Sequence, residues 1–226
     1  MSDYIEVKVI VEGKTEEIFI KSILQEYLAQ KNIFITPMQI SKPGQKGGDV
    51  KFSRALDDIS HHLKQRSDTY ISLFFDYYGI NSDWPGLDDA HRETVPLEIA
   101  SAINNATQTA VDKELSEYRS DIRFIPYIAV HEFESLLFSD SSKTASVLNI
   151  DKSKVDAIIN QFGDPEKINN SSETAPSKRL EKLYSRYKKT STGIKIAKEI
   201  GISKMRGECT VFDSWLKQLE LLVEVN

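Results

Sequence analysis

The chain has 226 residues, of which 40% are hydrophobic and 28% charged, which is typical of a water-soluble protein with one large domain or a domain with a smaller appendage. No apolar run approaches the roughly 20 residues of a membrane-spanning helix, and the N-terminus lacks the basic flank and apolar core of a signal peptide. The one cysteine, Cys209, excludes an internal disulfide and a four-cysteine zinc site and fits a reducing cytoplasm, which is the expected location.

The net charge of −5 is unevenly distributed along the chain. Residues 178–206 contain ten lysines or arginines and two glutamates, a local charge of +8, so the other residues sum to −13. Asymmetry of this kind indicates contact with a polyanion at one end. A solvated helical face covered in lysines is the alternative.

The first 140 residues alternate between strand-like and helix-like patterns. Alternation of this kind predicts an α/β fold with a mostly parallel sheet and helices on both faces. The expected strands are residues 5–11 (IEVKVIV), 33–40, 70–75 (YISLFF) and 122–130 (IRFIPYIAV), with Pro126 marking an edge or an irregularity, and the expected helices are residues 15–30, 50–65, 96–118 and a short one from 131 to 138.

Beyond residue 139 the strand signals fade, and the pattern predicts a helical C-terminal region. We therefore expect an α/β domain at residues 1–140 and a helical region at residues 141–226 packed on it. The expected helices there are residues 151–161, 178–187, 193–200 and 210–223, with a polar, loop-like stretch at 163–176. Cys209 and Trp215 are expected to pack between helices.

Acidic residues follow three of the expected strands. Glu12 comes after the first, Asp76 after YISLFF, and Glu132 and Glu134 after the last, while Glu16 lies one turn into the helix that follows Glu12. Because the carboxyl ends of parallel strands share one edge of the sheet, these side chains are expected to meet there.

Several like charges at one rim repel each other, and a bound cation is the simplest explanation of their coexistence. Oxygen-only ligands select hard ions, so Mg²⁺ or Mn²⁺ is the expected cofactor, able to polarise a phosphoryl oxygen and activate water. For any single acid, and above all for Glu17, the alternative is a carboxylate that stabilises the first turn of a helix.

The motif VEGKTEE after the first strand, with a later apolar strand ending in an aspartate, resembles the TOPRIM fold, the metal-dependent module of topoisomerases, bacterial primases and the overcoming-lysogenization-defect (OLD) nucleases. The segments DYYGINSDWPG, IPYIAVHEFESLLFSD, ETAPSKRL and GIKIAKEIGISKMRGECTVFDSWL together resemble the bacterial family known as domain of unknown function 4276. The resemblance covers nearly the whole chain and implies a TOPRIM-like (Rossmann-like) fold.

TOPRIM proteins carry a glutamate in the first motif, here Glu12, and an Asp-x-Asp pair after a later strand. This chain has Asp76 but carries Tyr78 where the second aspartate would stand. Because of this departure, the sequence does not decide whether the site binds one metal ion or two. Glu132 or Glu134 is the candidate for the missing oxygen ligand. Glu12, Asp76 and His131 are the candidate catalytic residues, His131 as a general base or phosphate contact, and a packed, structural histidine is the alternative.

Basic residues near glycines, tyrosines and helix starts are candidates for gripping phosphates. The loop KPGQKGGD has flanking lysines but lacks the spacing of a P-loop, so nucleotide hydrolysis by this chain alone is not expected. The candidate nucleic-acid-binding residues are Lys14, Lys42, Lys46, Lys178, Arg179, Arg186, Lys188 and Lys189.

Two functions from different classes remain. The first is a Mg²⁺- or Mn²⁺-dependent nuclease, with DNA favoured over RNA; the likeness to OLD nucleases implies a separate ABC-type ATPase partner and a role in antiphage defence. The second is a non-catalytic partner that only binds metal, nucleic acid or the ATPase, which the Tyr78 departure favours. A receiver or phosphatase with Asp76 as phospho-acceptor is a weaker third hypothesis, because it requires neither Glu12 nor the basic tail. A membrane partner is not expected, and a homo-oligomer is left open.

Overall fold

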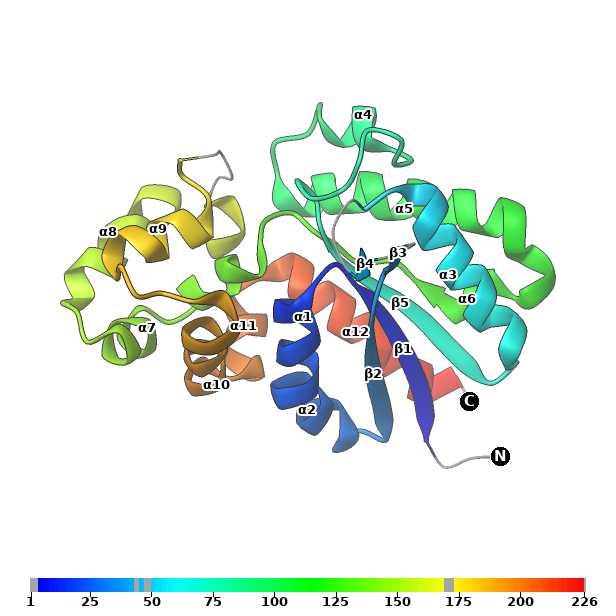
Figure 1. Ribbon diagram of the computed structural model, residues 1–226, viewed down its shortest axis with the longest axis horizontal. Coiled ribbons are helices and arrows are strands. Elements are labelled where there is room, and N and C mark those ends of the chain that lie inside the picture. The colour runs from blue at the N-terminus through cyan, green and yellow to red at the C-terminus, as the bar shows by residue number, and fades with distance from the viewer. Residues whose placement is uncertain (1–3, 43–44, 47–49, 169–172, 226) are drawn as a thin grey trace.

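The computed structural model describes residues 4–42, 45–46, 50–168 and 173–225, which form a parallel sheet flanked by helices (Figure 1). The strand order is β2-β1-β5-β6, with β7 also paired to β5, and every pairing in this sheet is parallel. The expected α/β class and mostly parallel sheet are therefore confirmed. The strands are β1 (Ile5–Val11), β2 (Ile33–Gln39), β5 (Thr69–Asp76), β6 (Phe124–Ile125) and β7 (Ile128–Ala129).

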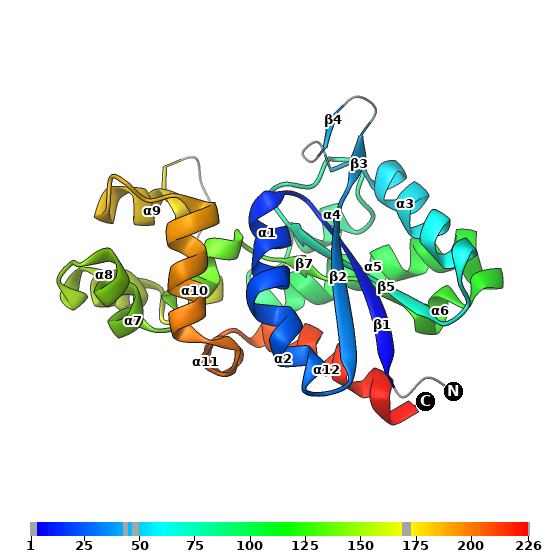
Figure 2. The same cartoon turned by 60° about the horizontal axis from the view of Figure 1, so that its bottom comes forward.

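Helices cover both faces of the sheet because alternate strand residues point to opposite sides (Figures 1 and 2). Ile10, Ile71 and Leu73 face α3 (Phe52–Gln65) and α5 (Pro96–Leu115). Val7, Val9 and Phe74 face the opposite side. That side is covered by α1 (Lys14–Phe19), the π-helical turn η1 (Ile20–Leu24), α2 (Gln25–Ala29) and α12 (Thr210–Val225).

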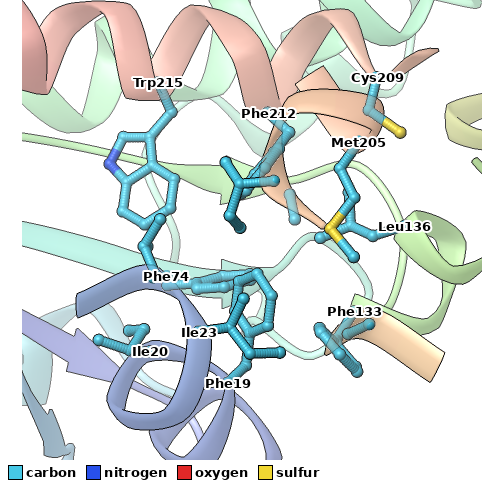
Figure 3. Close-up of a cluster of buried hydrophobic side chains, with 14 of the residues drawn as sticks. Phe19, Ile20, Ile23, Phe74, Phe133, Leu136, Met205, Cys209, Phe212 and Trp215 are labelled. Atoms are coloured by element: carbon cyan, nitrogen blue, oxygen red, sulfur yellow. The ribbon is translucent and has the colours of Figure 1, made fainter. Parts of the chain in front are cut away.

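The C-terminal helix α12 packs directly against the sheet (Figure 3). The Trp215 ring stacks on Tyr127 with centroids 4.4 Å apart, and its Nε1 donates to Ser72 Oγ at 2.9 Å. Ser72 Oγ in turn donates to the carbonyl of Ile125 at 2.7 Å. Trp215 and Cys209 are both buried at this interface, which confirms the packing role expected for them.

A helical lobe, residues 141–168 and 173–208, lies beside the sheet (left in Figure 1). Its buried side chains join the hydrophobic cluster on the α1 side of the sheet, so the lobe sits next to the helix that follows Glu12. The boundary expected at residue 140 stays a prediction. The lobe contains α7 (Ser141–Leu148), α8 (Lys152–Phe162), η4 (Pro165–Lys167), α9 (Pro176–Leu183), the π-helical turn η5 (Lys189–Gly193), α10 (Ile194–Ile200) and α11 (Ile202–Glu208).

The remaining elements are short connections. A two-stranded antiparallel hairpin lies within the loop expected around residue 45, whose residues 43–44 and 47–49 fall outside the described part of the chain. None of the helices in the described ranges is both long and apolar enough to cross a membrane. The short elements are β3 (Ser41–Lys42), β4 (Gln45–Lys46), α4 (Leu87–Ala90), η2 (Ser116–Tyr118), α6 (Ser120–Arg123) and η3 (Phe133–Phe138).

Two expected elements differ from the structure. Residues 122–130 do not form one strand: α6 runs to Arg123, and two two-residue strands flank Pro126, which has no N–H for the ladder. The helix expected at 178–187 ends at Leu183, because Tyr187 turns back into the protein and its hydroxyl donates to Glu134 Oε1 at 3.2 Å. The pattern also missed α7 and α11.

Candidate active site

Glu12 and Asp76 meet at the carboxyl ends of β1 and β5. The two strands are neighbours, with Val11 opposite Phe74, so the residues that come after them emerge at the same edge. A hydrogen bond from the Asp76 backbone reaches the Glu12 carboxylate. A Cβ on Gly79 would lie 2.5 Å from Glu12 Oε2, so the turn after β5 has room for this carboxylate only because it contains a glycine.

One oxygen of each of these two acids is buried without a hydrogen-bond partner. They are Glu12 Oε2 and Asp76 Oδ1. A buried polar atom without a partner costs roughly 1–3 kcal/mol, and more when it carries charge. Folded proteins keep few such atoms, and these two lie at one rim of the sheet.

Three further glutamates join this rim, and each has a partner of its own. Glu16 Oε2 accepts from the Gly13 N–H at 3.1 Å, which stabilises the start of α1. Glu132 Oε2 accepts from the Ser177 N–H at 3.0 Å, at the N-terminal end of α9. Glu134 is fully buried and accepts from the Tyr187 hydroxyl. The structure therefore brings together all five acids that the sequence singled out.

Lys189 supplies a positive charge to this cluster from the first residue of η5. Its Nζ lies 2.9 Å from Glu132 Oε1 and 3.2 Å from Glu134 Oε2. Burial acts to lower the pKa of Lys189, but the charges of Glu134 and Glu132 outweigh it and raise that pKa above its usual value. The Lys189 side chain is 41% exposed, so part of it reaches solvent while its ammonium bridges the two glutamates.

The pKa values of the acids show which of them remain uncompensated. Burial, followed by the charges of Glu16 and Glu12, raises the pKa of Asp76 well above its usual value. Burial also raises the pKa of Glu12 and Glu16, and it raises that of Glu134 to about 7. Burial acts in the same direction on Glu132, but hydrogen bonds from Ser177 and the charge of Lys189 lower its pKa overall. A cation beside Glu12 and Asp76 would relieve this repulsion.

The two unpartnered oxygens suit a hard divalent ion. Mg²⁺ binds through one or two carboxylates and keeps several waters, so two protein oxygens are enough to hold it. Within the described residues, no three His, Cys, Asp or Glu side chains are arranged as a ready-made cage for a metal ion. Glu12 and Asp76 are therefore the residues with free oxygens for such an ion, and metal binding here, like the expected ligand roles of Glu16, Glu132 and Glu134, stays a prediction.

His131 and Tyr78 form the edge of the site. The two rings stack with centroids 5.9 Å apart and planes 13° from parallel. Burial lowers the pKa of His131 to about 4, so its imidazole is neutral at pH 7, and its Nδ1 is buried without a partner. A base with so low a pKa is weak at neutral pH, which makes the carboxylates stronger candidates for accepting a proton.

The candidate nucleic-acid-binding residues do not form one group. Lys14 and Lys178 are exposed and paired with Glu17 and Glu181, and Arg179 stacks over the Phe162 ring 4.7 Å from its centroid. Lys189 lies inside the acidic cluster instead. Arg186 and Lys188 are exposed just before it, and Lys42 and Lys46 are in the β3–β4 hairpin, where their side chains lie outside the described structure.

Sequence reasoning separated Glu17 from the site and missed Tyr187 and Ser177 as partners of its acids. Glu17 pairs with Lys14 and Lys21, and hydrogen bonds from Lys21 and Gln39 lower its pKa to about 2 despite partial burial. The tyrosine and serine both stand near the basic C-terminal segments, but no local pattern indicates that they reach acids more than forty residues away.

Comparison with known proteins gives a family and two distant structural likenesses. The family model described as "Domain of unknown function (DUF4276)" matches residues 11–220. The C-terminal region of the Burkholderia pseudomallei OLD protein aligns at 14% identity and a TM-score of 0.46, over 96% of this chain and 98% of that chain. The corresponding region of the Xanthomonas campestris pv. campestris OLD protein aligns at 13% and 0.43, over 97% and 96%. No curated protein sequence matches significantly.

Proposed function

The chain belongs to the DUF4276 family, and because that description assigns no activity, we propose from the site itself that it hydrolyses phosphodiester bonds in nucleic acid with the help of Mg²⁺ or Mn²⁺. The observation that carries the proposal is the pair of buried, unpartnered oxygens of Glu12 and Asp76 at the end of two adjacent parallel strands. The resemblance of VEGKTEE and the later strand-ending aspartate to TOPRIM motifs supports the same reaction class.

Each residue of the site has a separate role in the proposed reaction. A bound divalent ion would polarise a phosphoryl oxygen and lower the pKa of water. Glu12, whose burial raises its pKa, is placed to accept the proton of the attacking water. Asp76, fixed at the end of β5, would hold that ion through its free oxygen, and the reacting phosphate would be placed by the ion. Lys189, whose side chain is 41% exposed, would turn its ammonium toward the charge developing on the phosphate.

The wider context is also part of the proposal. The basic residues Arg186 and Lys188, exposed beside Lys189, would hold the backbone of the strand, DNA in preference to RNA. The chain contains no P-loop motif, so we propose a separate ABC-type ATPase partner and a role in bacterial antiphage defence, on the basis of the sequence resemblance to OLD nucleases.

The experiment is cleavage of supercoiled plasmid by purified protein in Mn²⁺ or Mg²⁺, compared with Glu12→Gln, Asp76→Asn and Glu17→Gln. The first two variants are expected to lose about a hundredfold or more of the activity. Glu17→Gln is the matched control, because Glu17 belongs to the same motif yet is paired with Lys14 and Lys21 outside the site. Equal cleavage by all four proteins would indicate a contaminating nuclease.

A non-catalytic binding partner is the second candidate, and one observation favours it. Lys189 already compensates Glu132 and Glu134, and Tyr78 stands where TOPRIM enzymes have a second aspartate, so the rim has fewer free acids than a two-metal enzyme needs. Binding of Mn²⁺ or DNA without cleavage, with or without the ATPase, would support this alternative over the nuclease.

A further inference from the structure

Tyr78 is an aromatic side chain that is both exposed and held in place. At 56% it is the most exposed large hydrophobic side chain in the described part of the chain. One side of its ring stacks on His131, and Tyr77 contacts it edge-on with centroids 5.1 Å apart. Tyrosine also has few rotatable bonds, so a ligand that stacks on this ring loses little free energy in ordering it.

The backbone fixes Tyr78 relative to Asp76. The Gly79 N–H donates to the Asp76 carbonyl at 2.9 Å, which closes a turn with Tyr78 near its tip. The Tyr77 N–H donates to the Ala129 carbonyl at 2.8 Å and so ties the turn to β7. The exposed ring is therefore anchored two residues from Asp76, whose carboxylate would hold the ion.

We propose that Tyr78 is the platform on which an unpaired base of the substrate stacks, next to the site at Asp76. The inference rests on the proposed function, because it names the substrate class of that same site. A base inside a duplex is already stacked on both faces, whereas a base in a single strand, flap or frayed end can cover the exposed ring. The substrate is then a nucleic-acid strand with an unpaired nucleotide beside the bond to be cut.

The test is binding of a fluorescein-labelled 20-nucleotide single strand and of the same sequence as a duplex, in Ca²⁺, by the parent and three variants. A second single strand with 2-aminopurine reports stacking by loss of its fluorescence. Tyr78→Ala is expected to weaken single-strand binding about tenfold and to restore the 2-aminopurine signal. Tyr78→Phe keeps the ring and is expected to bind as the parent does.

Tyr4→Ala is the control, since Tyr4 is 46% exposed at the opposite, amino-terminal end of β1. Thermal unfolding of each variant shows whether it is folded. The inference is overturned if Tyr78→Ala binds the single strand as tightly as the parent. It is also overturned if Tyr78→Phe is as weak as Tyr78→Ala, which would assign the effect to the hydroxyl, or if the parent prefers the duplex or binds neither.

Plasmid cleavage by the parent in Mn²⁺ separates this inference from the proposed function. If the parent cuts nucleic acid and the Tyr78 variants have the same affinity and strand preference as the parent, the stacking role is contradicted and the nuclease activity is supported. If single strands stack on Tyr78 but neither the plasmid nor the labelled single strand is cut in Mn²⁺, the nuclease activity is contradicted and the ligand class is supported.

Discussion

The carboxylate of Glu166 differs from those of Glu12 and Asp76 in what surrounds it. Glu166 is 5% exposed, and burial raises its pKa to about 7. Both of its oxygens are nevertheless satisfied, Oε2 by the Val211 N–H at 2.8 Å and Oε1 by the Phe212 N–H at 3.0 Å. Glu12 and Asp76 are half-buried and also have raised pKa values, yet each keeps one buried oxygen without a partner.

The comparison shows that burial and a raised pKa do not identify a site by themselves. Glu166 accepts from the first N–H groups of α12 and lies at the positive end of its dipole, so its role in the fold accounts for it. No fold requirement explains the free oxygens of Glu12 and Asp76. A buried oxygen that costs stability and has no hydrogen-bond partner is better explained by a ligand.

The largest effect on stability is expected from Glu166→Ala. The change leaves two buried backbone N–H groups at the start of α12 without acceptors, each worth roughly 1–3 kcal/mol. We expect a loss of about 4 kcal/mol in the free energy of unfolding, measured by urea denaturation at pH 6. Glu208→Ala is the control, because its exposed pair with Lys204 is worth about 0.5 kcal/mol at most. An equal loss of unfolding free energy in the two variants would contradict the structural role assigned to Glu166.

Stability should also depend on pH through Glu166. Its carboxyl has a usual value of 4.5 and a pKa of about 7 in the folded protein, so between these values the folded state holds a proton that the unfolded state releases. Its contribution is complete below pH 4.5 and is lost as pH rises through 7, a change of about 3 kcal/mol.

The measurement is the unfolding free energy of the parent and of Glu166→Gln from pH 4.5 to pH 8. Other acids also titrate there, so the difference between the two curves isolates Glu166. Between pH 4.5 and pH 8, the unfolding free energy of Glu166→Gln should rise by about 3 kcal/mol relative to that of the parent. A constant difference would mean that the carboxyl does not titrate in this window.

A divalent ion should stabilise the folded protein through Glu12 and Asp76. At a free Mn²⁺ concentration a hundredfold above the Kd, binding adds about 2.7 kcal/mol, which raises the Tm of a chain of this size by roughly 5–10 °C. Glu17→Gln should show the same rise in differential scanning calorimetry, and Asp76→Asn should show almost none. If neither millimolar Mn²⁺ nor millimolar Mg²⁺ changes the Tm of the parent, the result would contradict the metal site.

Much of this arrangement could be predicted from the sequence, because it depends on the strands and on the residues at their carboxyl ends. The β-branched and apolar runs before Glu12 and Asp76 indicate buried parallel strands, and parallel strands bring their carboxyl ends to one edge. The break at Pro126 was harder to place, because the apolar residues on both sides of it fit a single strand as well as two short ones.

The place of Lys189 could not be predicted in this way. It stands in a basic stretch that favours phosphate binding, yet its partner Glu132 is 57 positions away in the chain. Long-range pairs of this kind depend on how η5 packs against η3, which no local periodicity encodes. The unpartnered oxygens could not be predicted from the sequence either, because a missing hydrogen bond is a property of the folded structure.

The smallest effect is the most direct test of the comparison. In EDTA at pH 8, Asp76→Asn should raise the free energy of unfolding by about 1–2 kcal/mol, because it keeps the side-chain shape and removes a carboxyl group whose charged form is disfavoured by burial and by the charges of three neighbouring acids. Asp213→Asn is the matched change. Asp213 lies 2.6 Å from Arg206 and 2.8 Å from Lys217, so its neutralisation should lower stability by a similar amount. If both variants lose stability, Asp76 is held by the fold as Asp213 is, and the distinction between a structural and a functional carboxylate does not hold here.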